Sequence, residues 1–238
     1  YMNAAKSMIG DLQRYKIFGK PLWLTEFCAW DGTSSSAAQC QFMAQSINYL
    51  EQDDDLERYA WFIPRWNQAT ESAPFMQLIT KAKPYELTER GILFVNMSTF
   101  DKNAVYPCGK RIPAEHYRAC SIDDSYASPA VSLCTDVNGI LQIDGLALNQ
   151  WMDYKINILS GVKDFQIRYT ATRDSEITIY RVDENGNETA LQTIALPSTA
   201  SKTAWTTLTE SFTPEAGEQV LRLKCTKGLP RINWFKLK

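Results

Sequence analysis

One glutamate stands where a buried strand is expected to end. Glu26 follows the apolar run Pro21–Leu24 and Thr25. An unbroken apolar run is typical of a parallel strand that is buried on both faces. In barrels of alternating strands and helices, the carboxyl ends of such strands carry the catalytic residues. We therefore expect Glu26 to be catalytic, and the alternative is a buried structural glutamate whose arginine partner is absent from this chain.

Three tryptophans lie near the ends of expected strands. Trp30 comes four positions after Glu26, while a second apolar run, Tyr59–Ile63, contains Trp61 and is followed by Trp66. Aromatic faces stack well against the apolar C–H faces of a pyranose ring. The spacing predicts a sugar-binding site, with core packing as the alternative. At Trp61 that alternative stays open, because this residue lies within its strand.

The first hundred residues alternate between helical and strand patterns. Residues 3–16 place their apolar side chains on one helical face, at Ala5, Met8, Ile9, Leu12 and Tyr15. Ser36 and Gln39 are spaced as a capping box for a helix that continues to Leu50, and Thr88 is placed to cap a last helix. Helices alternating with buried strands predict part of an α/β fold with parallel strands.

From about residue 110 the apolar pattern changes to a period of two. Apolar and polar side chains alternate over residues 152–158 and 165–169, and further strands are expected at 177–179, 205–212, 220–225 and 232–237. The segment Asp183–Asn187 has the composition of a turn. Several short strands separated by turns predict a β-sandwich. We expect the linker between the two halves near Thr99–Lys110.

Composition excludes several classes of partner. The chain has 238 residues and a formal net charge of −2, so no broad positive field is available for nucleic acid. Its apolar runs are shorter than the ~20 residues that a membrane span needs. Six cysteines without Cys-x-x-Cys spacing, and a single histidine, make a zinc site improbable. Disulfides formed in an oxidising compartment are the better interpretation, with Cys28–Cys40 as the favoured local pair.

The first half resembles the catalytic core of glycoside hydrolase family 128, a clan A family that cleaves β-1,3-glucans. The resemblance is carried by residues 20–27 with Trp30, by 42–51, by 57–62 and by Leu87–Gly91. It implies that Glu26 ends the seventh strand of a (β/α)8 TIM barrel and is the nucleophile. Trp61 or Trp66, at the eighth strand, would then form the floor of a sugar subsite.

The resemblance also implies that half of the catalytic pair is absent. The acid/base of this family lies at the end of the fourth strand, and the present sequence matches only the part of the barrel that follows the fifth. A full barrel takes ~250 residues, so two strands cannot close one. We therefore expect a missing N-terminal barrel segment or a companion chain to complete the first domain.

The second half resembles a family 6 carbohydrate-binding module, a β-jelly roll. The matching segments are 112–117, 150–158, 204–207, 216–217, 221–223 and 232–235. In this family Trp151 and Trp205 correspond to core residues. Lys202 and Arg231 replace an aromatic residue and an asparagine of the usual loop-edge sugar site, which puts that site in doubt, although Tyr126 remains a candidate stacking residue.

A structural calcium ion is usual near the first strand of such modules. Glu115 corresponds to one calcium ligand, whereas Pro113 replaces a second acidic residue. No cofactor is expected for catalysis.

Together these features predict an α/β domain, the C-terminal portion of a TIM barrel over residues 1–105, followed by a β-sandwich carbohydrate-binding module over residues 110–238. The predicted function is that of a part of a secreted, retaining endo-β-1,3-glucanase that binds β-glucan polysaccharide. The alternative is a non-catalytic glucan-binding or structural extracellular protein that derives from such an enzyme.

Overall fold

The chain folds into two compact units. The computed structural model describes residues 5–30, 35–65, 75–98, 101–123 and 127–238. Unit 1 contains residues up to 99 together with 122–128, and unit 2 contains residues 100–121 and 129–238. No helix in these ranges is long and apolar enough to cross a membrane.

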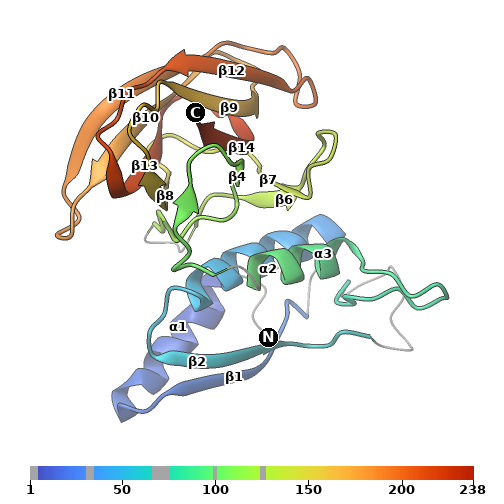
Figure 1. The fold of residues 1–238 in the computed structure, drawn as a ribbon. Helices are drawn as coiled ribbons and strands as arrows, with labels where there is room; N and C mark the ends of the chain where they lie inside the picture. Colours follow the sequence, from blue (N-terminus) through green and yellow to red (C-terminus); the bar gives the residue numbers. More distant parts are fainter. Residues whose placement is uncertain (1–4, 31–34, 66–74, 99–100, 124–126) are drawn as a thin grey trace. The chain divides into compact units, whose positions relative to one another are not determined.

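Unit 1 is a parallel two-stranded sheet with helices on one face (Figure 1). Its elements are α1 (Ala5–Tyr15), the short 3₁₀ helix η1 (Lys16–Phe18), β1 (Leu22–Phe27), α2 (Ser36–Leu50), β2 (Leu56–Trp61) and α3 (Glu89–Ser98). Phe27 packs against Phe42 of α2, and Tyr59 packs edge-on against Phe94 of α3. These aromatic contacts bury the face of the sheet that carries Phe27 and Tyr59.

The ends of the helices follow local capping chemistry. The side chain of Ser35, one residue before the expected cap, accepts a hydrogen bond from the backbone N–H of Ala38. Gln39 does not complete a capping box, because its buried amide bonds both the N–H and the C=O of Ala29. Thr88 caps α3 as expected, since the N–H of Gly91 donates to its hydroxyl at 3.2 Å.

A TIM barrel is not seen in the described part of unit 1. Apart from one isolated bridge between Ile79 and Leu87, its only strand pairing there joins β1 and β2. Trp23 is 60% exposed, and the guanidinium of Arg58 lies 5.2 Å from the centre of its ring. Unit 1 is therefore a mixed α/β unit whose sheet is covered by described helices on the Phe27 and Tyr59 face.

Unit 2 is a sandwich of two six-stranded sheets (Figure 1). One sheet has the order β11-β10-β13-β8-β3, with β5 also paired to β8, and the other has the order β12-β9-β14-β7-β6, with β4 also paired to β14. The strands are β3 (Tyr106–Pro107), β4 (Ile112–Pro113), β5 (Ala119–Cys120), β6 (Val131–Leu133), β7 (Leu141–Ile143), β8 (Trp151–Ile158), β9 (Asp164–Thr170), β10 (Ser175–Val182), β11 (Glu188–Leu196), β12 (Thr206–Ser211), β13 (Gly217–Lys227) and β14 (Arg231–Leu237).

The core of the sandwich forms where the inward residues of both sheets meet. Tyr154 of β8 packs edge-on against Phe235 of β14, and Phe235 stacks on Phe165 of β9. All three are fully buried. The twofold pattern of the sequence thus predicts the inward face correctly, and the β-sandwich is confirmed.

The segment expected to be a linker contributes to the sandwich. Tyr106 and Pro107 form β3, which pairs in parallel with β8, and the hydroxyl of Tyr106 donates to the backbone carbonyl of His116 at 3.1 Å. Proline and glycine obscure the strand pattern in Thr99–Lys110. A two-residue edge strand is too short to show a period.

The expected disulfides are absent, because none of the six cysteines is bridged to another in the structure. The prediction of a Cys28–Cys40 pair is therefore wrong. Burial raises the pKa of Cys40 to about 12. The charged and polar neighbours of this thiol are Glu89, Arg90 and Ser36. Cys28 lies near Glu26 instead, and burial raises its pKa to about 11. The two thiols thus face different groups in unit 1.

Candidate functional site

Glu26 is an exposed residue near the end of β1. It lines a cavity of about 290 Å³ whose other walls come from α1, from Leu24 and Phe27 of β1, and from Phe42 of α2. Among the described residues Glu26 is therefore not enclosed by a packed core. A carboxylate at this position is open to solvent and to a reactant.

The tryptophans of the first half lie in different environments. Trp61 is only 6% exposed, packs edge-on against Phe27 at 5.1 Å between ring centres, and donates its indole N–H to the carbonyl of Met76 at 2.8 Å. The structure thus places Trp61 in the core, where it offers no face to a sugar, and corrects its assignment as a binding residue. Trp30 is half-buried, with its ring 5.8 Å from that of Phe62. Trp66 lies outside the described residues.

The loop edge of the sandwich is closed by contacts within the protein. Arg231 pairs with Asp144, while Asn233 donates to Asp136 at 2.8 Å. Lys202 is exposed, and Tyr126 lies outside the described residues. The arginine that replaces the usual asparagine is thus engaged in an ion pair.

A larger cavity lies on the other sheet of the sandwich. We call it the sheet groove; its volume is about 830 Å³, and its walls come from β8, β10, β13, β5 and the β10–β11 turn. Its lining includes Arg118, Trp151, Asp153, Lys155, Arg181, Glu184, Glu218 and Arg222. A cavity of this size falls within the range of small-molecule binding sites.

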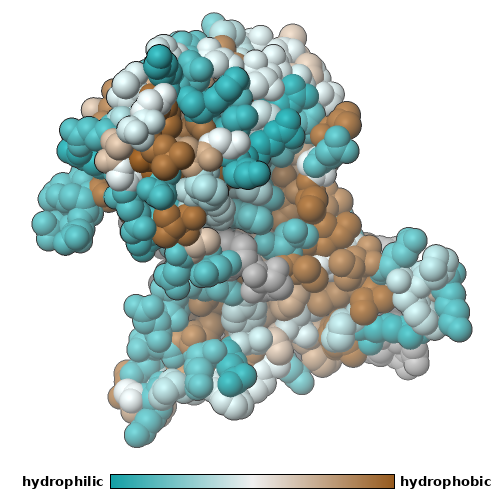
Figure 2. Space-filling view, in the orientation of Figure 1, coloured by the Kyte–Doolittle hydropathy of each residue, from teal (hydrophilic) through white to brown (hydrophobic). Residues whose placement is uncertain are grey.

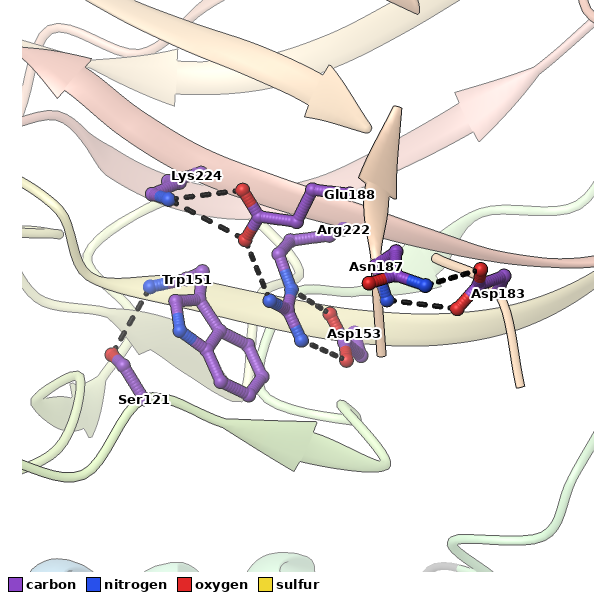
Figure 3. Close-up of polar contacts among 8 residues, drawn as sticks. All are labelled: Ser121, Trp151, Asp153, Asp183, Asn187, Glu188, Arg222 and Lys224. Carbon is purple, nitrogen blue, oxygen red and sulfur yellow. Dashed lines mark hydrogen bonds and ion pairs between the residues drawn. The ribbon is translucent and has the colours of Figure 1, made fainter. Parts of the chain in front are cut away.

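Arg222 is the central side chain of the sheet groove (Figure 3). It lies opposite Asp153 in the pairing of β13 with β8, and its Nε and Nη2 donate to the two carboxylate oxygens of Asp153 at 2.7 and 2.8 Å. Its Nη1 donates to Glu188 at 2.7 Å, and Lys224 pairs with the same carboxylate at 3.1 Å. These four charges balance, because two are positive and two are negative.

The charges of this network are stabilised by one another. Burial alone would lower the pKa of Arg222, but hydrogen bonds to Asp153 and Glu188 outweigh it and raise that pKa. Burial would likewise raise the pKa of Glu188, yet Arg222 and Lys224 hold it below its ordinary value. Asp153 is the exception, because its burial outweighs the contact with Arg222 and raises the pKa of this carboxyl. The hydrogen bonds still fix the positions of these side chains, so the groove presents a fixed set of polar groups to a ligand rich in hydroxyl groups.

Trp151 lines the groove instead of belonging to the core. It is half-buried, and the guanidinium of Arg222 lies 3.5 Å from the centre of its ring. Its backbone N–H donates to the hydroxyl of Ser121 at 3.1 Å, which ties the start of β8 to the segment after β5. The interpretation of Trp151 as a core residue is therefore wrong. Trp205 is also half-buried, and its indole N–H donates to Thr135 at 3.0 Å.

The β10–β11 turn borders one end of the groove and is a hydrophilic projection of the surface (Figure 2). The carboxylate of Asp183 accepts hydrogen bonds from the backbone N–H groups of Asn185 and Asn187 and from the side chain of Asn187, at 2.8 to 2.9 Å. The turn predicted over Asp183–Asn187 is thus confirmed, and its side-chain bonds fix its shape.

Glu115 is a buried carboxylate with an unpaired oxygen. It is 4% exposed, and its Oε2 has no hydrogen-bond partner. Burial raises the pKa of Glu115 to about 7. Within the described ranges no group of three or more His, Cys, Asp and Glu side chains could hold a metal ion. One orphaned oxygen fits a hard cation, with carbonyl groups or water as the remaining ligands.

The alternation of polar and apolar residues along β8 marks the groove as well as the strand. The polar positions of β8 that alternate with its core residues, Asp153 and Lys155, lie on the outer face of their sheet and line the groove. Arg222 comes from a distant strand, and the register of β13 against β8 brings it to Asp153, while Glu188 of β11 bonds Arg222. No local motif marks such a site.

Comparison with known proteins agrees with the two halves of the structure. The model of the glycosyl hydrolase catalytic core matches residues 1–94, and the model of carbohydrate binding module family 6 matches residues 114–238. No curated protein matches the chain.

Similar solved structures include several isolated modules. A β-1,3-glucan binding family 6 module from Bacillus halodurans is 20% identical, with a TM-score of 0.49 and coverage of 57% of this chain and 99% of that chain. A module from Clostridium stercorarium in complex with cellobiose is 19% identical, with a TM-score of 0.48 and coverage of 57% and 98%. A module of Cellvibrio mixtus lichenase 5A in complex with cellotriose is 23% identical, with a TM-score of 0.47 and coverage of 55% and 97%.

The family 6 model spans more than half of the 238 residues, and it covers the strands that build the sheet groove. The glycosyl hydrolase model covers β1 and Glu26. The chain therefore belongs to carbohydrate-binding module family 6 and carries this module behind a glycosyl hydrolase catalytic core region.

Proposed function

We propose that the chain is part of a secreted, retaining endo-β-1,3-glucanase in which Glu26 is the nucleophile. The observation that carries this proposal is the exposed carboxylate at the end of β1, inside the region that matches a glycosyl hydrolase core. In a retaining enzyme one carboxylate attacks the anomeric carbon, and a second, ~5–5.5 Å away, first protonates the leaving oxygen and then activates water. This second group would come from a preceding barrel segment or a companion chain.

The preference for β-1,3 linkages rests on the resemblance of residues 1–100 to family 128 glucanases. Secretion is proposed on the same ground, since such enzymes act on polysaccharides outside the cell.

The sandwich would hold β-glucan in the sheet groove. Trp151 supplies an aromatic surface, Asp153 and Arg222 supply polar groups beside it, and Glu188 helps to hold the Arg222 guanidinium in place. This combination of a ring and a few oriented polar side chains is typical of sugar sites. The loop edge is the weaker candidate, because Arg231 is paired there with Asp144. We further propose a structural calcium ion at Glu115, and no cofactor for catalysis.

A non-catalytic glucan-binding or structural extracellular protein is the second candidate. It needs only the sandwich, whose two sheets and sheet groove lie within the described residues. Sugar binding by the sandwich would not require residues of unit 1. The two candidates differ in whether the Glu26 carboxylate takes part in catalysis.

The nucleophile is tested in the complete protein by Glu26→Gln. We expect this variant to bind laminarin normally but to lose turnover by several orders of magnitude, because covalent attack needs the carboxylate. Release of reducing ends from laminarin is the measurement. Turnover close to that of the unchanged protein would exclude Glu26 as the nucleophile, and inactivity of both proteins would favour the non-catalytic candidate.

The sheet groove is tested by Trp151→Ala in the 238-residue chain. We expect the affinity for laminarin oligosaccharides, measured by isothermal titration calorimetry, to fall about tenfold, which equals ~1.4 kcal/mol. Trp205→Ala is the matched control at the loop edge, and it should change the affinity little. The reverse pattern would place the glucan at the loop edge.

A further inference from the structure

A small cavity lies on the outer face of the β12-β9-β14 sheet, which is the sheet that does not form the sheet groove. Its volume is about 210 Å³, and it is lined by Arg111, Arg168, Thr207, Trp234 and the loop Asp136–Asn138. Arg168 of β9 pairs with Thr207 of β12 on one side and with Trp234 of β14 on the other. We call this cavity the arginine pocket.

The acidic residue of the arginine pocket is fully engaged. Nε and Nη2 of Arg168 donate to the two oxygens of Asp136, both at 2.8 Å, and Asn233 donates to Oδ2 at the same distance. The hydrogen bond from Arg168 is the main cause that lowers the pKa of Asp136. This carboxylate therefore stays ionised and neutralises Arg168.

Arg111 has no such partner among the described residues. Its guanidinium lies 4.3 Å from the centre of the Trp234 ring, and the side chain is exposed. A cation–π contact uses the face of the guanidinium and leaves the N–H groups along its edge able to donate. With two arginines and one aspartate, the arginine pocket carries a net charge of +1. Trp234 thus holds the positive guanidinium of Arg111 at the cavity, with N–H groups that have no hydrogen-bond acceptor among the described residues.

We propose that the arginine pocket binds the anionic group of an acidic sugar, either the carboxylate of a uronate or a sulfate ester. A planar guanidinium is suited to bidentate recognition of such oxyanions. Thr207 and Asn138 offer neutral groups to sugar hydroxyls, and the volume lies below that of drug-sized sites, so the pocket suits one sugar unit. The proposal rests on membership of a carbohydrate-binding family and is independent of the sheet groove.

The test is an NMR titration of the ¹⁵N-labelled 238-residue chain with trigalacturonate, with glucose 6-sulfate and with neutral laminaritriose. The side-chain N–H signals of Arg111 and Trp234, assigned by substitution, report on the pocket. We expect an acidic probe to shift both signals and laminaritriose to leave them unchanged. Binding by trigalacturonate identifies a uronate site, and binding by glucose 6-sulfate identifies a sulfate ester site.

Three variants separate recognition from general charge. Arg111→Gln should weaken binding of the acidic probe at least tenfold. Arg111→Lys should weaken it less, because lysine keeps the charge but loses the planar pair of N–H donors. Arg173→Gln removes the same charge from an exposed arginine outside the pocket and should have no effect. The proposal is overturned if no acidic probe shifts either signal, if laminaritriose shifts them equally, or if Arg173→Gln weakens binding as much as Arg111→Gln.

Discussion

At the scale of single residues, Glu115 is a side chain of the sandwich that is costly to keep charged. Its unpaired oxygen is enclosed by protein, so the ionised form loses hydration without gaining a hydrogen bond at that atom. Tyr106 and Tyr154 lie close to it, and the pKa of each is raised, mainly by its own burial and then by the Glu115 charge. A proton or a cation bound at Glu115 would neutralise the buried carboxylate and remove this cost.

We predict that the sandwich loses stability as pH rises in calcium-free buffer. The folded pKa of Glu115 is about 7 against an ordinary value of 4.5, so the folded state binds the proton more tightly. The stabilisation is fully present below pH 4.5 and is lost as pH rises through 7; it amounts to ~3 kcal/mol. Urea unfolding of the sandwich at pH 5 and pH 8, with EDTA, measures this loss.

Substitution and calcium then identify the group responsible. Glu115→Gln should flatten the dependence on pH, whereas Glu184→Gln, at an exposed turn position, should not change it. Calcium that restores stability at pH 8 in the unchanged chain but not in Glu115→Gln would support the proposed ion. An unaltered pH profile in Glu115→Gln would contradict the assignment.

At the scale of elements, the short strands complete the sheet of the groove. β8 pairs with β13 over eight residue pairs, from Gly217 with Ile158 to Lys224 with Trp151. On its other side, the described residues that pair with β8 are those of the two-residue strands β3 and β5. Without β3, part of the edge of β8 would expose unpaired backbone groups, a known route to aggregation.

We predict that a fragment of residues 101–238 is more stable than a fragment of residues 110–238. The shorter fragment lacks β3, the half-buried ring of Tyr106 and its hydrogen bond to His116, a loss of ~1–2 kcal/mol. Midpoints of urea unfolding measure the difference. A fragment that begins at Val105 keeps β3 and is the control, and equal stability of all three fragments would contradict a structural role for β3.

At the scale of the whole molecule, the two units differ in what they contain. The described residues of the sandwich form two sheets and a shared aromatic core, and charged side chains line both the sheet groove and the arginine pocket. Unit 1 has a two-stranded sheet with exposed residues such as Trp23. Under the proposed function, the sugar-binding site lies within this chain, whereas catalysis requires a second carboxyl group from another segment.

We predict that the purified 238-residue chain does not hydrolyse β-1,3-glucan, because general acid assistance to the leaving group is missing. Reducing ends released from laminarin over several hours provide the measurement. The Glu26→Gln form of the same chain is the control for contaminating enzymes. Activity that is present in the unchanged chain and absent from this control would show that the catalytic pair is complete.

The sequence by itself determined most of the longer elements and the inward face of the sandwich, whereas the two- and three-residue strands β3 to β7 were not predicted. Apolar periodicity is local, so α1, α2, β8 and β9 could be predicted from neighbouring residues alone. The edge strand β11 was missed, because most of its residues are exposed and show little alternation. The cysteine count suggested disulfides, but no disulfide joins the six cysteines in the tertiary structure.

Only the tertiary structure decided which side chains meet. Trp61 and Trp151 are both strand tryptophans, yet packing under α2 buries the first, and the outward face of β8 brings the second to the groove. Arg222 lies 69 positions after Asp153 and reaches it through strand register. Local sequence patterns set the faces of each element, whereas contacts between distant strands depend on how the elements pair, and this information is spread over the whole chain.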